Sequence, residues 1–285
     1  MAVQRMRSLE AEMKCPGCDA EVVERHLGLQ VVRAEQGEER LQATYACPAC
    51  GLSSAIEPSR DKLKSWWLLT KGAMLQAEGR FQEALSCFDF LLSHDPRSAM
   101  AWYNKGCALA KMQRFSEAVG NYDQALVIDP QDTEAWHNKG HALRRLGRLA
   151  EALGCFDSAL LISPKRETTH VSKGNLLLAM GQSREARGCF DQALGINSRN
   201  SDAWLGKGCA LAQSRRLGEA IECFEKALAV SPRDVDSWNF KGKALEAAGR
   251  PLEAMECFDR ALVIDPENLL ARERKERLLA RLSRA

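Results

Sequence analysis

The motif Lys-Gly-x-x-Leu occurs six times, and successive copies are separated by 34 residues without exception. Its glycines are Gly72, Gly106, Gly140, Gly174, Gly208 and Gly242. A fixed period of this length is typical of a solenoid in which each repeat is one small supersecondary unit. Such a unit cannot bury its apolar face alone. Neighbouring repeats must therefore stack into a continuous core, and they leave a long surface free for a partner.

Each repeat is predicted to be a pair of helices. Counted from Ser65, the repeats 1 to 6 are 65–98, 99–132, 133–166, 167–200, 201–234 and 235–268. Positions 8 and 11 are always glycine and leucine, and positions 20, 24 and 28 are alanine, an aromatic residue and leucine. These spacings of three and four residues place each set on one helix face. We expect the glycine to face the alanine of position 20 where the two helices cross, with the aromatic residue of position 24 as filler.

This pattern resembles the tetratricopeptide repeat family, and the match covers residues 65–268 without an insertion. Four tryptophans stand at the family's tryptophan position: Trp102, Trp136, Trp204 and Trp238. The resemblance implies a mainly α fold, a right-handed α-solenoid of six helical hairpins. Its first helices would line a concave groove that binds peptides or proteins. Residues 269–285 continue the pattern and are predicted to form a C-terminal capping helix.

One departure from the family is systematic, because position 7 is lysine in every repeat. The lysine lies between core positions, and a partly buried ammonium needs a partner. Position 25 is acidic in every repeat, and it lies on the side of the second helix that faces the next repeat. We therefore expect each acid to pair with the lysine of the next repeat, from Asp89 with Lys105 up to Asp259 with Lys275 of the capping helix. Pairing within one repeat is the alternative.

Residues 1–60 contain two CxxC motifs, and a small β zinc ribbon is predicted there. Two such motifs can place four thiolates around one structural Zn²⁺. The predicted ligands are Cys15, Cys18, Cys47 and Cys50. Between the motifs, apolar and polar residues alternate as in strands over 21–24, 29–33 and 41–45. A module this small needs the metal in order to fold. We also expect Trp67 and Met74, at the open end of repeat 1, to hold the ribbon.

Composition narrows the class of protein. The net charge is only +2, so no domain has the basic character of a nucleic-acid binder. No apolar run approaches the ~18–20 residues of a membrane span, and the N-terminus has no signal-peptide core. The seven cysteines outside the CxxC motifs are interpreted as reduced, half-buried apolar residues. A cytoplasmic location is therefore expected. No nucleophile–base pair or phosphate-binding loop is visible, so we expect no enzymatic activity.

The basic, amide-rich part of the expected groove lies in repeats 2 and 3. Its candidate residues are Asn104, Lys111, His137, Asn138, His141, Arg144 and Arg145. Related peptide-binding members of the family grip a carboxylate with such residues, although the lysine that they place at position 5 of the first repeat is absent here. We predict that this part binds an acidic segment or a chain-terminal carboxylate. A solvated helix face without a specific ligand is the alternative.

The sequence therefore favours a non-enzymatic scaffold that binds protein or peptide partners. The alternative is a regulator associated with nucleic acid or polymerase through its zinc ribbon. Repeat 4 is predicted to be the weakest link, because His170 and Ser198 replace the usual tryptophan and proline, and Gly188 and Gly195 lie inside its second helix.

Overall fold

The computed structural model describes residues 27–33, 39–46, 53–56 and 60–283. The chain divides into two compact units, residues 1–96 and 97–285, and each is considered by itself. The four cysteines of the predicted zinc site lie outside the described residues.

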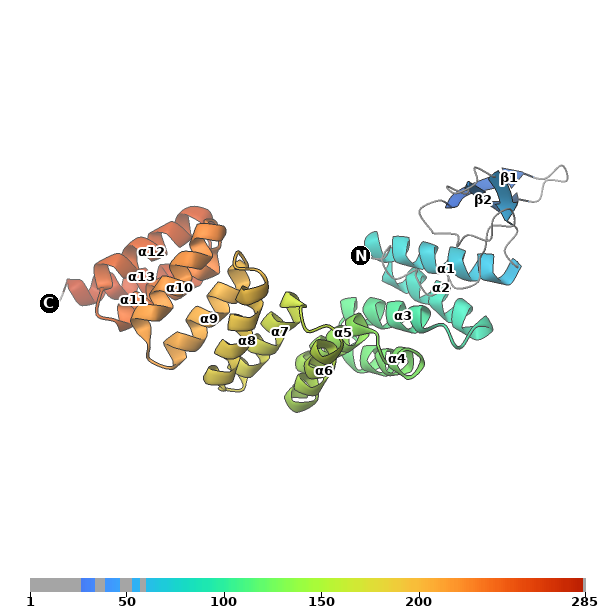
Figure 1. Cartoon of the computed structure of the whole chain (residues 1–285). Coiled ribbons are helices and arrows are strands. Elements are labelled where there is room, and N and C mark those ends of the chain that lie inside the picture. Colours follow the sequence, from blue (N-terminus) through green and yellow to red (C-terminus); the bar gives the residue numbers. More distant parts are fainter. Residues whose placement is uncertain (1–26, 34–38, 47–52, 57–59, 284–285) are drawn as a thin grey trace. The chain divides into compact units, whose positions relative to one another are not determined.

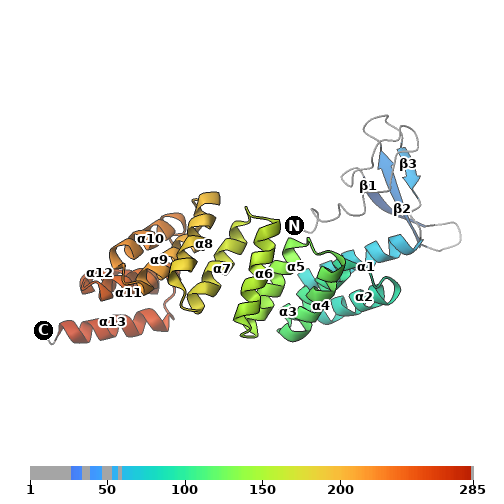
Figure 2. The same cartoon turned by 60° about the horizontal axis from the view of Figure 1, so that its bottom comes forward.

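The first unit contains a three-stranded antiparallel sheet with the order β1-β2-β3 (Figure 2). The strands are β1 Leu27–Arg33, β2 Glu39–Ala46 and β3 Ser53–Ile56. Leu27 lies opposite Tyr45, and Ala46 lies opposite Ser53. The start of β1, the end of β2 and the start of β3 therefore share one end of the sheet. The alternation over 29–33 and 41–45 falls in β1 and β2, whereas the sequence analysis missed β3.

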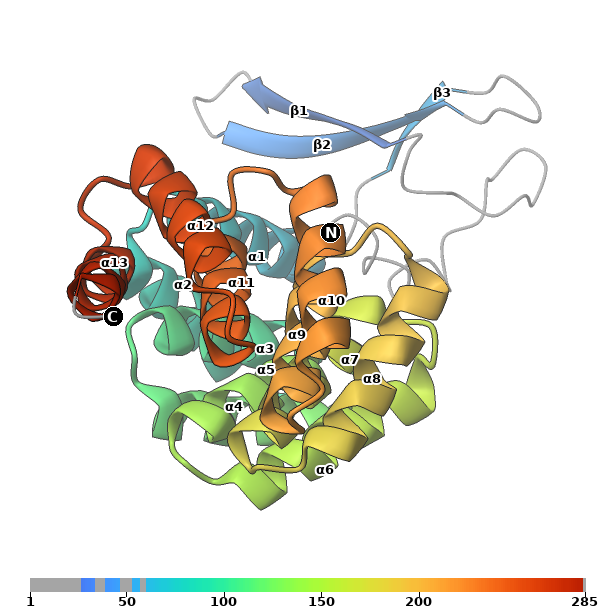
Figure 3. The ribbon, with the colours of Figure 1, turned by 90° about the vertical axis from the view of Figure 1, so that its left-hand side faces the viewer.

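From residue 60 onward the described chain is helical, and each 34-residue repeat contains one pair of helices. In the first unit these are α1 Arg60–Ala77 and α2 Phe81–His94. In the second unit the pairs are α3 Ala99–Lys111 and α4 Phe115–Ile128, α5 Thr133–Arg145 and α6 Leu149–Ile162, α7 Glu167–Ala179 and α8 Ser183–Ile196, α9 Ser201–Gln213 and α10 Leu217–Val230, and α11 Val235–Ala247 and α12 Pro251–Ile264, followed by α13 Leu269–Leu282. Figure 1 shows these pairs of the second unit following one another along it, and Figure 3 shows that successive pairs are rotated. None of the described helices has the length and apolar character needed to cross a membrane.

The aromatic side chain of position 24 occupies the centre of each repeat. Phe224 is fully buried, and a Cβ atom added to Gly208 would lie 2.4 Å from its ring. In all six repeats the nearest atoms to such a Cβ belong to this ring. The expectation that the glycine faces the alanine of position 20 stays a prediction, because the atoms nearest to the glycine belong to the ring. The glycine makes room for a ring that reaches across from the second helix.

The turn between the two helices has the same backbone conformation in every repeat. Position 15 has a positive φ in all six: Gly79, Gln113, Gly147, Gly181, Arg215 and Gly249. The next residue immediately precedes the second helix, and in five repeats it is an arginine that binds the glutamate three residues later through two hydrogen bonds of 2.6–2.7 Å. These pairs are Arg80–Glu83, Arg114–Glu117, Arg148–Glu151, Arg216–Glu219 and Arg250–Glu253. Repeat 4 has Gln182 there and lacks the pair.

Position 4 donates a hydrogen bond to the backbone carbonyl at position 32 of the preceding repeat. Trp136 Nε1 donates to Pro130 O at 2.9 Å. The bond survives where tryptophan is lost, because His170 Nε2 lies 2.9 Å from Pro164 O and Arg272 donates to Pro266 O at 2.7 Å. An N–H donor at this position therefore ties consecutive repeats together, a role that the family pattern alone did not reveal.

The predicted lysine ladder is confirmed at the five interfaces within the second unit. The pairs are Lys139–Asp123, Lys173–Asp157, Lys207–Asp191, Lys241–Glu225 and Lys275–Asp259, with N–O distances of 2.5–2.9 Å. Each acid pairs with the next repeat and not with its own. Where position 4 is tryptophan, the lysine also lies over its ring, as in Lys139, whose Nζ is 5.1 Å from the Trp136 ring centroid. The pair Asp89–Lys105 involves both units and stays a prediction.

The prediction that Trp67 and Met74 hold the N-terminal module is wrong. Trp67 is 44 % exposed and Met74 is 60 % exposed. Lys71 from the same helix lies over the indole, with Nζ 4.6 Å from the ring centroid. The indole therefore makes a cation–π contact within α1.

Candidate partner-binding site

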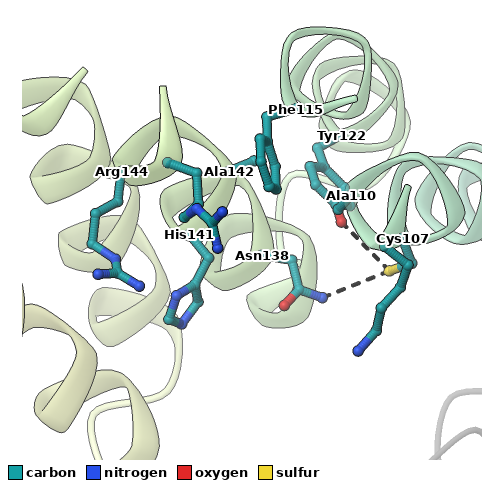
Figure 4. Close-up of a pocket in the computed structure, with 10 residues that line it drawn as sticks. Cys107, Ala110, Phe115, Tyr122, Asn138, His141, Ala142 and Arg144 are labelled. Atoms are coloured by element: carbon teal, nitrogen blue, oxygen red, sulfur yellow. Dashed lines mark hydrogen bonds between the residues drawn. The ribbon is translucent and has the colours of Figure 1, made fainter. Parts of the chain in front are cut away.

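A hollow of about 300 Å³ lies where α3, α4 and α5 meet, and we call it the α3–α5 hollow (Figure 4). Its lining residues are Cys107, Ala110, Lys111, Phe115, Tyr122, Asn138, His141, Ala142, Arg144 and Arg145. Five of the seven predicted groove residues are among them. They come together because positions 6, 9, 12 and 13 lie on neighbouring faces of the first helices in repeats 2 and 3. Asn104 is half-buried on α3 and is not one of the lining residues.

The hollow carries positive charge. Lys111, Arg144 and Arg145 are exposed and line it, and none of its lining residues is a carboxylate. Within the described part of the chain, none of the three forms an ion pair. Arg145 is oriented by Phe115, with its guanidinium carbon 4.9 Å from the ring centroid. An anion that enters the hollow would therefore not have to displace a carboxylate from these three cations.

One wall of the hollow is a polar network between α3, α4 and α5. Asn138 Nδ2 donates to Tyr103 OH at 2.8 Å and lies 3.8 Å from Cys107 Sγ. Tyr122 OH donates to the same sulfur at 3.6 Å, and burial raises the pKa of this phenol. The amide nitrogen of Asn138 thus has two acceptors within the protein, and Figure 4 shows the bond to Cys107. If Asn138 donates a hydrogen bond to a ligand, as predicted, it must lose one of these two bonds.

The two histidines differ from the expected cationic groove residues. His137 is only 9 % exposed, and its Nδ1 lies 2.9 Å from Thr169 Oγ1 on α7. Its Nε2 lies 3.1 Å from Nε2 of His141, which is half-buried. Burial lowers the pKa of each ring to about 4, with further lowering of His137 by His141 and of His141 by Arg144. Both rings are therefore neutral at neutral pH. The inclusion of His137 as a groove residue is corrected, because position 5 of α5 packs against α7.

The described residues contain no group of three or more His, Cys, Asp or Glu side chains that could hold a metal ion. The seven cysteines of the repeats are free thiols. Burial raises the pKa of Cys155 to about 11 and that of Cys209 to about 12, so both stay protonated and weakly reactive. This agrees with their interpretation as small apolar residues.

Two aromatic lining residues, Phe115 and Tyr122, were not predicted as groove residues by the sequence analysis. Tyr122 carried a signal, since it is the single tyrosine at a position that is otherwise phenylalanine. A buried phenol requires a hydrogen-bond partner, and Cys107 provides it. Phe115 carried no such signal, because the first residue of the second helix is also aromatic in repeat 1.

The stacked helix pairs, with a polar hollow on the face of their first helices, define a solenoid protein built from helical hairpins. Three family models described as "Tetratricopeptide repeat" match residues 99–132, 132–199 and 205–268, which together make up more than half of the chain. The chain belongs to the tetratricopeptide repeat family. The presence of these repeats supports the interpretation of the chain as a scaffold for protein–protein interactions.

Solved structures agree on the fold. YrrB, described as a TPR protein with an unusual peptide-binding site, is 23 % identical over 66 % of this chain and 97 % of its own, with a TM-score of 0.55. The pilF protein of Pseudomonas aeruginosa is 18 % identical over 75 % of this chain and 97 % of its own, with a TM-score of 0.64. MamA is 20 % identical over 59 % of this chain and 92 % of its own, with a TM-score of 0.54. No curated protein matches the sequence.

Proposed function

We propose that the protein is a non-enzymatic scaffold whose α3–α5 hollow binds an acidic segment or chain-terminal carboxylate of a partner protein. The observation that carries this proposal is the convergence of Lys111, Arg144 and Arg145 on one hollow that has no carboxylate in its lining. Peptide binding is also what the description of YrrB states for that protein, and we extend it to this chain.

The arrangement suits a carboxylate for a physical reason. A guanidinium presents paired N–H groups that match the two oxygens of a carboxylate, and such charge-assisted bonds are stronger than neutral ones. Arg145 is already held against Phe115, so less rotamer entropy is lost when it binds. Phe115, Ala110 and Ala142 supply an apolar surface for the side chain next to the bound carboxylate.

The first test is fluorescence anisotropy with labelled acidic peptides, each made with a free and an amidated C-terminus. The double variant Arg144→Ala/Arg145→Ala is expected to weaken binding by about tenfold or more, since each bond to a charged group contributes roughly 1.5–3 kcal/mol. Exposed arginines outside the hollow provide the matched control, Arg199→Ala/Arg233→Ala. Equal affinity of both double variants would reject the hollow as the binding site. A loss of affinity on amidation identifies the terminal carboxylate as the recognised group.

A regulator associated with nucleic acid remains the alternative function, and a gel shift with duplex DNA and with RNA tests it. Electrostatic nucleic-acid binding weakens steeply as salt rises. A salt-sensitive shift would support this alternative, whereas a scaffold of the proposed kind gives no shift.

We also propose that Cys15, Cys18, Cys47 and Cys50 bind one structural Zn²⁺. The sheet register supports this, because Cys47 directly follows the end of β2, and that end of the sheet is also where β1 and β3 begin. Both CxxC motifs are thus connected to the same end of the sheet.

Metal analysis of the native protein is expected to find about one zinc per chain. Cys47→Ser should release the zinc while circular dichroism shows the helices intact. Cys87→Ser, a change of a half-buried cysteine in α2, is the control that keeps the metal. Native protein without zinc would refute the site.

A further inference from the structure

The joint between repeats 3 and 4 includes a chain of polar side chains. His137 bonds to Thr169, and His141 Nε2 lies 3.1 Å from Ser172 Oγ on the same helix, α7. Thr169 occupies position 3, which is alanine in repeats 2, 3 and 5. The N-terminus of α7 has no side-chain cap, in contrast to α3, α5, α9, α11 and α13. These bonds are therefore polar links between α5 and α7 in addition to the ladder pair Lys173–Asp157.

The hydrogen positions in this chain of bonds can be deduced. Ser172 Oγ donates to Thr168 O at 2.9 Å, so towards His141 it can only accept. Nε2 of His141 therefore carries the hydrogen, and it is directed at both Ser172 Oγ and His137 Nε2. His137 Nε2 must then be the bare acceptor, and its Nδ1 carries the hydrogen that is donated to Thr169. The chain of bonds from Ser172 to Thr169 is thus complete with both rings neutral.

The surroundings oppose a further proton. Arg144 on α5 and Arg166 before α7 lower the pKa of His141, after the larger effect of burial. Glu134, whose charge raises the pKa of His137, is already paired with Arg166. The ring of Phe156 on α6 packs against both imidazoles, with its centroid 5.7 Å from that of His137 and 5.3 Å from that of His141. On the side of α3 and α4, the groups that share the hollow with His141 are Lys111, Cys107 and Tyr122.

We propose that the His137–His141 pair is a proton-sensitive joint between repeats 3 and 4. A proton added to His137 Nε2 places its N–H opposite the N–H of His141, which breaks the chain of bonds from α5 to α7. The attachment of α7 is then weaker, although the Lys173–Asp157 pair and the His170–Pro164 bond remain. Because His141 also lines the α3–α5 hollow, the same proton changes that hollow. This inference does not require the proposed ligand.

The direction of the pH effect follows from linkage. Both rings have a pKa of about 4 in the closed joint, against about 6.5 for an exposed histidine. Between these values the opened joint binds more protons than the closed one. The joint is therefore fully closed above about pH 6.5 and loosens as the pH falls towards about 4.

Two measurements on the full chain test the proposal. Nitrogen-15 NMR of the histidine rings at neutral pH should show the hydrogen on Nδ1 of His137 and on Nε2 of His141. Amide exchange, corrected for its intrinsic pH dependence, should show protection in α7 falling about tenfold or more relative to α9 between about pH 7 and pH 4.5. The comparison with α9 is matched, since Lys207 of α9 and Lys173 of α7 make equivalent ladder pairs.

A double variant removes the titrating groups while it keeps the donors. In His137→Asn/His141→Gln, an amide nitrogen replaces each ring N–H, and the acid-induced loss of α7 protection should disappear. His170→Gln keeps the position-4 donor and is the control that retains the loss. Opposite tautomers in the unchanged protein, or α7 and α9 losing protection equally, would overturn the proposal whether or not the double variant folds.

Discussion

Position 15 of each repeat has a positive φ whatever residue stands there. Four repeats place glycine at this position, but Gln113 and Arg215 adopt φ values of 62° and 61°. A left-handed conformation brings the Cβ of an L-residue close to its own carbonyl, whereas glycine avoids the contact. The backbone is held there because the N–H of the following arginine bonds back to the leucine of position 11, as Arg114 does to Leu109 at 2.9 Å. Repeats 2 and 5 therefore carry local strain.

Gln113→Gly and Arg215→Gly are each expected to stabilise the second unit by about 0.5–1 kcal/mol, since the relief of strain exceeds the entropic cost of glycine. Urea unfolding followed by circular dichroism measures the change. Gly147→Ala, the reverse change at an equivalent position with φ 75°, should destabilise by a similar amount. If all three variants shift the midpoint in the same direction, backbone strain is not the cause.

At the scale of the helices, the interfaces of the second unit at which position 4 is tryptophan combine an ion pair, a cation–π contact and the position-4 hydrogen bond. Lys207 pairs with Asp191 of the preceding repeat at 2.7 Å and lies 5.3 Å from the ring centroid of Trp204. Its side chain is 24 % exposed, whereas that of Asp191 is 47 % exposed. Water screens this ion pair mainly on the side of the carboxylate. We therefore expect the pair to contribute more to the specificity of the register between repeats than to the free energy of folding.

A double-mutant cycle with Asp191→Ala and Lys207→Ala should give a coupling energy of about 0.5 kcal/mol that shrinks as salt is added. Lys207→Ala alone should cost more than Asp191→Ala alone, because it also removes the stem that packs on Trp204. A coupling that salt leaves unchanged would show that packing, not charge, joins the two side chains.

At the scale of the whole molecule, stability is distributed over repeats that contact only their neighbours. Repeat 4 lacks the cap of its first helix and the Arg–Glu pair of its second. Gly188 and Gly195 lie inside α8, and a Cβ added to either would meet no atom within 4 Å. These glycines weaken the helix without serving a close approach, which supports the prediction that repeat 4 is the weakest link.

Amide exchange at neutral pH is expected to be faster in α8 than in α6 and α10. Gly188→Ala and Gly195→Ala should each slow it, with a gain of up to about 1 kcal/mol in helix stability. Gly208→Ala is the contrasting control, because its Cβ would lie 2.4 Å from the ring of Phe224 and should destabilise repeat 5 by roughly 1–3 kcal/mol. Equal amide exchange rates in α6, α8 and α10 would show that repeat 4 is not the weakest link.

The sequence by itself determined the helix pairs, the core positions and the lysine ladder. These depend on spacings of three and four residues along one helix and on a period that repeats six times, so a single register satisfies them all. The cations of the hollow followed from the same spacing, since Lys111 and Arg145 both stand at position 13 of neighbouring repeats.

Only the tertiary structure decided what each side chain touches across an interface. Gly208 accommodates the ring of Phe224, and His137 bonds to Thr169. Asn138 donates hydrogen bonds to Tyr103 and Cys107. Such contacts depend on the rotation of one helix against the next, and a linear pattern does not encode it. They also depend on which atom carries each hydrogen, and only the full set of bonding partners determines that.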